Sequence, residues 1–542
     1  MENKMKKDSL LKSSLWISLS GILSRILSVI YIIPWNIWIG PIAVGAANAL
    51  YGKVYNIYNL FLIIATAGIP SAISKEVAAH NALGRFDQSE KLFKKYTIYM
   101  SLVGVVLAFI MFFGAKYVAI VLAAGDMRVV TPIKYLSVAM LIIPALGILR
   151  GYIQGYAFIS YSAFSQVIEQ IARVAYMLYA TYTIMILQKG NYMTAVNQST
   201  LASFIGATLA YLFLLWIRIK VRRSVTVTDI KTTTDIPTDE NTPDINFNSM
   251  LRSAIPFLLV DTIMTVLQLF DQTTFSWIYE LILHASQRTI DDLYAMFGFQ
   301  ANKLIMVLVS LAISVSSSVI PALSAMISRK VGTEQIQKLM RNIVQFTVFI
   351  ILPATFGMIA ISRQLWTVFV FYDQSILGSK VLMVSCFEAF FYCVFMILEN
   401  ILQVSHHVKK SLIYLAIAYL LKVVLQLPLT LAMGVYGPLV ASTIAFMVMG
   451  HFAFRLINKQ FQVVDKALGK KLLRILIDGL IMLVVVAVAD FLVVKVISDA
   501  TKIGATIVII ICGLIGVAVY GFLSYKDGSL NILKDIRDTK IY

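Results

Sequence analysis

Long, uninterrupted runs of apolar residues are the dominant pattern along this chain. A helix needs about 20 mostly apolar residues to cross a bilayer, and runs of this kind recur fourteen times. The strands of a membrane barrel would alternate apolar and polar positions with a period of two, and these runs do not alternate. The pattern therefore predicts an all-α polytopic membrane protein with about 14 transmembrane helices.

The expected spans are separated by shorter polar segments. They cover residues 14–39, 46–74, 96–122, 131–155, 161–187, 198–219, 251–283, 297–327, 342–369, 381–404, 411–433, 437–458, 472–496 and 503–524. The first run is too long for the core of a signal peptide and contains Arg25, so we expect it to be retained as a helix.

Motifs that correspond in the two halves of the chain indicate an internal repeat. The matching pairs are AGIPSAIS at 67–74 with SVIPALSA at 318–325, ILRGYIQG at 148–155 with ILENILQV at 397–404, and IARV at 171–174 with LLKV at 420–423, at offsets of 249 to 251 residues. This repeat predicts two pseudo-symmetric six-helix bundles plus two C-terminal helices. The expected domains are an N-terminal bundle at 1–219, a cytoplasmic polar linker at 220–250, a C-terminal bundle at 251–459, and two additional helices with a cytoplasmic tail at 460–542.

Composition supports a membrane protein and limits its chemistry. Of the 542 residues, 59% are hydrophobic and 14% are charged, with a formal net charge of +18. Lys and Arg concentrate in the alternate segments that share a side with the termini, so the positive-inside rule places both termini in the cytoplasm. The basic excess therefore describes topology and does not indicate a nucleic-acid partner. No nucleophile, metal cluster or Gly-rich phosphate loop stands out, so we expect no catalytic residues, no resident cofactor and no metal site.

Five of the basic residues that lie inside the expected spans are singled out as candidates. Placing an ion at mid-bilayer costs about 2.5 to 3.5 kcal/mol, so such residues face a partner or a wet cavity. Lys53 and Lys303 are related by the repeat, as are Arg173 and Lys422, while Arg25 lies in the first helix. Because Arg25, Lys53 and Lys303 have no evident partner on their own helix, we expect uncompensated cations that attract an anionic head group such as a diphosphate. All five are candidate substrate-binding residues.

Two acidic residues are candidates for ion coupling, with Na⁺ or H⁺ as the coupling ion. Asp271 lies midway along its helix in LQLFDQTTF. A buried acid that bonds neighbouring hydroxyls is the competing interpretation. Glu169 lies four residues before Arg173, a spacing that equally fits a purely structural ion pair.

Several stretches carry a resemblance to a known family. LSRIL in the first helix, YGKVYNIYNLFLIIATAGIPSAISKEVA at 51–78, RGYIQG at 150–155 and SQVIEQIARV at 165–174 resemble the polysaccharide-exporter branch of the multidrug/oligosaccharidyl-lipid/polysaccharide (MOP) superfamily. Within it, the chain is most similar to the MurJ-like lipid II flippases and to stage V sporulation protein B-like proteins. Arg25 matches the family's first-helix arginine, and Lys303 falls where many members have arginine. A second arginine common in that helix is replaced here by Tyr31.

The resemblance implies a flippase, not an enzyme, that moves undecaprenyl-diphosphate-linked peptidoglycan precursor across the bacterial plasma membrane by alternating access, in cell wall biogenesis and cell shape. Its expected partners are that lipid-linked glycan, membrane lipids and the cell-wall polymerase machinery, with the chain acting as a monomer. The thirteenth and fourteenth helices are expected to form a groove for the polyprenyl tail. The alternatives are a flippase for another lipid-linked glycan (capsule, teichoic-type or sporulation-related), a cation-coupled multidrug antiporter, and a non-transporting assembly scaffold.

Overall fold

The computed structural model describes residues 10–66, 68–229, 247–329, 331–405, 407–463 and 465–532. All regular secondary structure in these residues is helical. Each of the fourteen expected spans is matched by one long helix or by two consecutive helices, which confirms the predicted fold class. Nine segments among the described residues are long and apolar enough to cross a membrane. The number of crossings stays a prediction, as does the side of the termini, because residues 1–9 and 533–542 lie outside the described ranges.

The chain forms two compact units whose segments are not contiguous in sequence. Unit 1 comprises Met1–Tyr31 and Leu50–Thr273, and unit 2 comprises Ile32–Ala49 and Thr274–Tyr542. The domain limits expected from the sequence remain a prediction. Most of the expected linker, residues 230–246, lies outside the described residues.

Unit 1 is a helical bundle built around α8, most of whose residues are buried. The helices α8 and α4 approach each other closely, since a Cβ added to Gly151 would lie 2.4 Å from the Pro70 carbonyl oxygen. The helices that form unit 1, wholly or in large part, are α1 (Leu10–Ile30), α3 (Val44–Thr66), α4 (Ile69–Ala82), α5 (Phe86–Phe113), α6 (Ala115–Leu122), α7 (Val130–Met140), α8 (Ile143–Gly155), α9 (Ile159–Tyr182), α10 (Tyr192–Asp229) and α11 (Phe247–Trp277).

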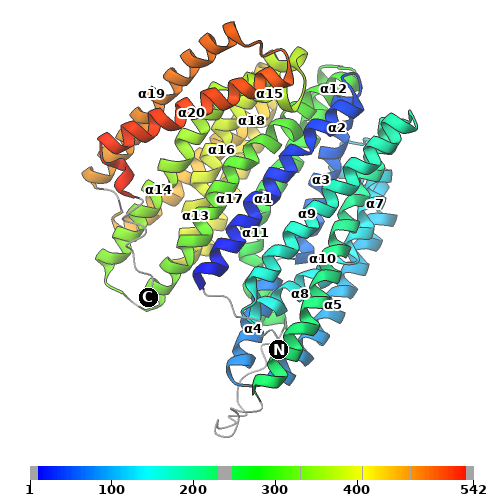
Figure 1. Cartoon of the computed structure of the whole chain (residues 1–542), viewed down its shortest axis with the longest axis vertical. Helices are drawn as coiled ribbons and strands as arrows, with labels where there is room; N and C mark the ends of the chain where they lie inside the picture. Colours follow the sequence, from blue (N-terminus) through cyan, green and yellow to red (C-terminus); the bar gives the residue numbers. More distant parts are fainter. Residues whose placement is uncertain are drawn as a thin grey trace. The chain divides into compact units, whose positions relative to one another are not determined.

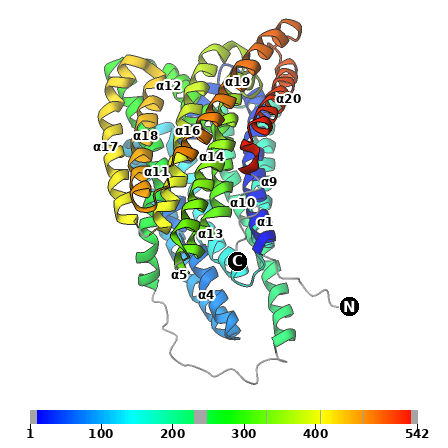
Figure 2. The same cartoon turned by 90° about the vertical axis from the view of Figure 1, so that its left-hand side faces the viewer.

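Unit 2 is a second helical bundle. The neighbouring helices α19 and α20 lie side by side in the orange and red part of Figure 1, and α17 runs beside α18 in Figure 2. Its helices are α2 (Ile32–Ile39), α12 (Gln287–Tyr294), α13 (Asn302–Ser328), α14 (Thr333–Ala360), α15 (Ser362–Phe369), α16 (Ser375–Val404), α17 (Val408–Met433), α18 (Gly437–Phe461), α19 (Lys466–Val496) and α20 (Lys502–Lys526).

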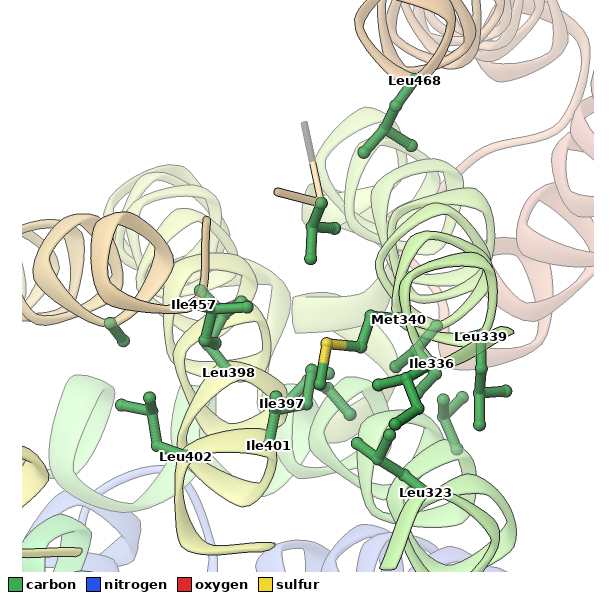
Figure 3. Close-up of a cluster of buried hydrophobic side chains, with 14 residues drawn as sticks. Leu323, Ile336, Leu339, Met340, Ile397, Leu398, Ile401, Leu402, Ile457 and Leu468 are labelled. Carbon is green, nitrogen blue, oxygen red and sulfur yellow. The ribbon is translucent and has the colours of Figure 1, made fainter. Parts of the chain in front are cut away.

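A hydrophobic cluster joins five helices of unit 2 (Figure 3). Leu323 of α13, Met340 of α14, Ile401 of α16 and Ile457 of α18 are at most 2% exposed, and Leu468 adds the start of α19. Removing this apolar surface from water or from head groups stabilises the inner packing of the bundle. A further cluster, on α14, α19 and α20, attaches the two C-terminal helices to the same unit.

The order and pairing of helices repeat between the two halves of the chain. In the first half α4 packs on α8, and α9 on α10; in the second half α13 packs on α16, and α17 on α18. Each half also has an eight-residue helix, α6 or α15, directly after a 28-residue helix. The repeat inferred from sequence motifs is therefore present as a repeated pattern of packing.

The ends of those two eight-residue helices are capped by amide side chains from distant segments. In unit 2, Asn36 of α2 donates through Nδ2 to the carbonyl oxygen of Phe369, the last residue of α15, at 2.7 Å. In unit 1, Gln272 of α11 donates through Nε2 to the carbonyl oxygen of Leu122, the last residue of α6, at 2.6 Å. Phe369 and Leu122 are equivalent in the repeat. Each capping residue comes from the first expected span of the opposite half of the chain, which agrees with the exchange of segments between the compact units.

Lys502 fixes the start of α20 to the end of α15. Its Nζ donates to the carbonyl oxygens of Thr367, Val368 and Val370 at 3.2, 2.7 and 2.8 Å. These are carbonyl groups at the C-terminal end of a helix, which carry partial negative charge and favour a cation. The arrangement positions the additional helix pair against the bundle.

Candidate functional site

Three ionised side chains meet between α8 and α9, and we call them the Arg150 triad. Arg150 of α8 donates through Nη2 to Glu169 Oε2 at 2.8 Å, and Arg173 of α9 donates through Nη2 to Glu169 Oε1 at 2.7 Å. Arg150 Nε also donates to Ser165 Oγ at 3.1 Å. Each carboxylate oxygen therefore holds one guanidinium, and the triad carries a net charge of +1.

The triad lies mostly inside unit 1. The side chains of Arg150, Glu169 and Arg173 are 18%, 16% and 22% exposed. Charge-assisted hydrogen bonds are strong in such surroundings, and the excess positive charge favours an anion nearby. Glu169 and Arg173 form the ion pair that their i,i+4 spacing allowed as one interpretation, and Arg150 joins it as a second arginine.

Tyrosines of α3 surround Arg173. The rings of Tyr51 and Tyr55 stack with centroids 4.4 Å apart, and the Tyr55 hydroxyl lies 2.6 Å from Ser203 Oγ of α10. Tyr58, 2% exposed, lies near Ser203 and Arg173, but its hydroxyl forms no hydrogen bond with any described residue. Arg173 Nε is likewise buried without an acceptor among the described residues. Two polar groups at this place are therefore left without a hydrogen-bond partner.

Lys53 of α3 is compensated by a carboxylate. Its Nζ lies 3.0 Å from Asp126 Oδ2, and the two side chains are 1% and 7% exposed. Asp126 also accepts hydrogen bonds from Nε and Nη2 of Arg128, both at 2.8 Å. Burial raises the pKa of Asp126, but the hydrogen bonds from Arg128 and the charge of Lys53 outweigh it and hold the pKa at about 2. The expectation that Lys53 is an uncompensated cation is wrong, because its partner comes from a segment 73 residues away.

The remaining candidates lie on other helices. Lys303 of α13 is partly buried, with Nζ 5.4 Å from the centroid of the Phe299 ring. Lys422 of α17 is fully buried and donates to the Ser442 hydroxyl of α18. Arg25 of α1 is partly buried and Asp271 of α11 is 8% exposed. The structure thus brings together Glu169 and Arg173, while Lys303 and Lys422 belong to unit 2.

Within the described part of the chain, no group of three or more His, Cys, Asp or Glu side chains could hold a metal ion. Cys386, Cys393 and Cys512 are free, buried thiols.

Sequence reasoning missed Arg150 and Asp126. Arg150 was visible as an arginine inside the expected span 131–155, within the repeat motif ILRGYIQG. Its pairing with Glu169 could not be predicted, because the two residues are 19 positions apart on different helices. Asp126 lies just outside an expected span, and only the fold brings it to Lys53.

Comparison with known proteins places the chain in a family. The model of the family described as "Polysaccharide biosynthesis protein" matches residues 10–327, more than half of the chain. The chain belongs to the polysaccharide biosynthesis protein family. The model of a second family, MatE, matches residues 300–428 as well.

Relatives of this family member extend over nearly its whole length. The lipid II flippase MurJ of Bacillus subtilis (strain 168) is 29% identical over 96% of this chain and 96% of that protein. A structure of lipid II flippase MurJ in an inward closed conformation aligns with a TM-score of 0.66 at 17% identity, covering 95% of this chain and 99% of that one. An inward-facing MATE family multidrug resistance transporter of the MOP superfamily aligns with a TM-score of 0.58 at 14% identity, covering 84% and 98%. These structures share the fold of this chain, and its apolar helices together with the similarity to MurJ identify a multi-pass membrane protein.

Proposed function

We propose that this protein is a flippase that moves undecaprenyl-diphosphate-linked peptidoglycan precursor (lipid II) from the inner to the outer leaflet of the bacterial plasma membrane. The observation that carries the proposal is its similarity to a lipid II flippase along 96% of both chains. The mechanism is alternating access, in which repeated bundles expose one site to each side of the membrane in turn.

The charges of the bundle suit this substrate. A diphosphate is a compact anion, and guanidinium and ammonium groups bind phosphate oxygens strongly. Arg150 and Arg173 supply a net positive charge in unit 1, and Arg25, Lys303 and Lys422 remain proposed contacts of the head group. Lys53 is a weaker candidate, since Asp126 already neutralises it.

We keep Asp271 as the proposed ion-coupling residue, with Na⁺ or H⁺ as the ion. Glu169 is a poor site for a cation, because a guanidinium occupies each of its carboxylate oxygens. Coupling through Asp271 predicts that Asp271→Asn abolishes the dependence of transport on an ion gradient. The matched acid-to-amide change at Glu280, which lies at the end of the same helical span, should leave that dependence unchanged.

The test of the substrate is flipping by the purified full-length chain in proteoliposomes. Labelled lipid II is placed on one leaflet, and its appearance on the other is followed by accessibility to an enzyme or reagent that cannot cross the membrane. We expect lipid II to be flipped, and growth to be restored in a strain depleted of its lipid II flippase. Liposomes that flip another undecaprenyl-diphosphate-linked glycan but not lipid II would replace the substrate and keep the flippase.

A multidrug antiporter is the second candidate, because the MatE model matches residues 300–428 and a MATE transporter shares the fold. It predicts drug sensitivity after deletion with normal wall synthesis. Cytoplasmic termini, cell-wall polymerase partners and a monomeric state are further parts of the proposal. Labelling of single cysteines at each end of the chain from either side of the membrane would test the orientation.

A further inference from the structure

We propose that the Arg150 triad is a binding site for a diphosphate group, in which Glu169 is an internal counter-ion that limits how tightly the anion is held. The chemical class of the ligand rests on the proposed function, and the diphosphate of a lipid-linked substrate is the source we assign. Arg150 and Arg173 are the ligand contacts, and Tyr58 supplies a hydroxyl.

Two hydrogen-bond donors at the triad have no acceptor among the described residues. The Tyr58 hydroxyl and Arg173 Nε are buried and have no hydrogen-bond partner among the described residues. Leaving buried donors unsatisfied is costly, and native proteins rarely do so without a reason. Arg173 Nε belongs to the guanidinium, and Tyr58 lies near that guanidinium. Both groups are suitable donors to a phosphoryl oxygen. A bound anion would satisfy them and would neutralise the net charge of +1.

The second half of the repeat shows that the fold does not require this triad. At an offset of 249 residues, Arg150 corresponds to Glu399 and Glu169 corresponds to Ala418. The second half nevertheless packs α16, α17 and α18 together as the first half packs α8, α9 and α10. An arginine pair on one carboxylate is therefore an addition to the first half of the chain and not a condition for building a bundle of this kind.

The carboxylate of Glu169 also favours release of a bound anion from the two arginines. A carrier must bind its cargo well enough to take it up and weakly enough to let it go, as in conduction through multi-site pores. Glu169 uses one N–H group of each arginine and cancels one of the two positive charges. Removing this carboxylate should leave two guanidinium groups with full charge facing the anion.

A diphosphate site of this kind predicts that changes to the arginines and to the glutamate of one ion-pair network shift the binding affinity in opposite directions. Arg150→Gln and Arg173→Gln should each weaken diphosphate binding about ten- to hundredfold, the range expected for loss of a charge-assisted hydrogen bond. Glu169→Gln should tighten binding about tenfold and slow turnover. A network that only holds the helices together would lose stability in all three variants and gain affinity in none.

The experiment uses the full-length protein in lipid nanodiscs, with calorimetric titration of inorganic pyrophosphate and of geranyl diphosphate. Arg341→Gln is the matched control, because it breaks an arginine–carboxylate pair of similar length, 2.8 Å to Asp465, in unit 2. We expect both probes to bind, Arg341→Gln to bind as the unaltered chain does, and the triad variants to change as stated.

Three results would overturn the inference. Unchanged affinity in folded Arg150→Gln would remove the arginines as ligand contacts. Equal or weaker binding by Glu169→Gln would remove the counter-ion role, and this readout applies even if the arginine variants fail to fold. Binding of pyrophosphate without geranyl diphosphate would assign the site to a free anion. In each case lipid II flipping by the unaltered chain would still support the proposed function, whereas a chain that binds diphosphate but flips no lipid-linked glycan would contradict the function alone.

Discussion

Removing the carboxylate of Asp126 should destabilise the protein more than removing the ammonium group of Lys53. The pKa of Asp126 falls from an ordinary 3.8 to about 2 in the folded chain. At 1.36 kcal/mol per pKa unit, this corresponds to about 2 kcal/mol of stability. Asp126→Asn also leaves Lys53 buried at 1% exposure without this carboxylate, so we expect a total loss of about 3 to 5 kcal/mol. In Lys53→Met the carboxylate keeps its three hydrogen bonds from Arg128, and we expect a loss of stability of about 1 to 2 kcal/mol.

The pH dependence of stability follows from the direction of that pKa. Because the folded pKa lies below the unfolded one, the stabilisation is complete at neutral pH and is lost as the pH falls from about 3.8 to about 2. Asp126→Asn should therefore lose less stability than the unaltered chain over this interval. The assay is reversible unfolding in mixed micelles, followed by tryptophan fluorescence at pH 7, 4 and 2.5.

The repeat supplies the matched control for this experiment. Lys303→Met removes the counterpart of Lys53, which lies over the Phe299 ring, and we expect a loss of at most about 1 kcal/mol. If Lys303 binds substrate, this variant should lose flipping while remaining stable. A stable Asp126→Asn protein, or a stable Lys53→Met protein that has lost flipping, would refute the expectation that Lys53 acts mainly by stabilising the fold with Asp126.

Three further changes test the packing. Gly151→Leu should prevent α8 from approaching Pro70 of α4 and should cost about 3 kcal/mol or more, measured as unfolding in the same micelles; an unchanged midpoint would contradict this close approach. Lys502→Met should remove three hydrogen bonds to the end of α15 and increase proteolysis of the last two helices, with Lys526→Met as the control. Asp465→Ala removes the N-cap of α19 and should lower the free energy of unfolding by about 1 kcal/mol. An unchanged free energy of unfolding would mean that α19 does not depend on this cap.

Periodic and local features of the structure were predictable from the sequence, because apolar length alone determines a transmembrane helix. The fourteen helical segments and the repeat belong to this class, and so does the i,i+4 pair of Glu169 and Arg173, which is fixed by helix geometry. The breaks within several spans were not expected, although Gly68, with a φ of 64°, and Pro70, two residues later, stand where α3 gives way to α4.

The candidate site was predicted less completely than the fold. Intramembrane cations can be listed from a sequence, but the charge that each one meets depends on which helices pack together. Lys53 was expected to be available to a ligand and instead meets Asp126. Arg150, which joins Glu169 from another helix, was not a candidate at all.

The amide caps from Asn36 and Gln272 have a consequence for the origin of the chain. Separating the two halves between α10 and α11 would leave each half without the helix that caps its own eight-residue helix, because that helix belongs to the other half. A protein that consisted of one such half would therefore be complete only as a dimer, in which each copy caps the other with its first helical segment. A single polypeptide that contains both halves keeps this exchange of helices within one molecule.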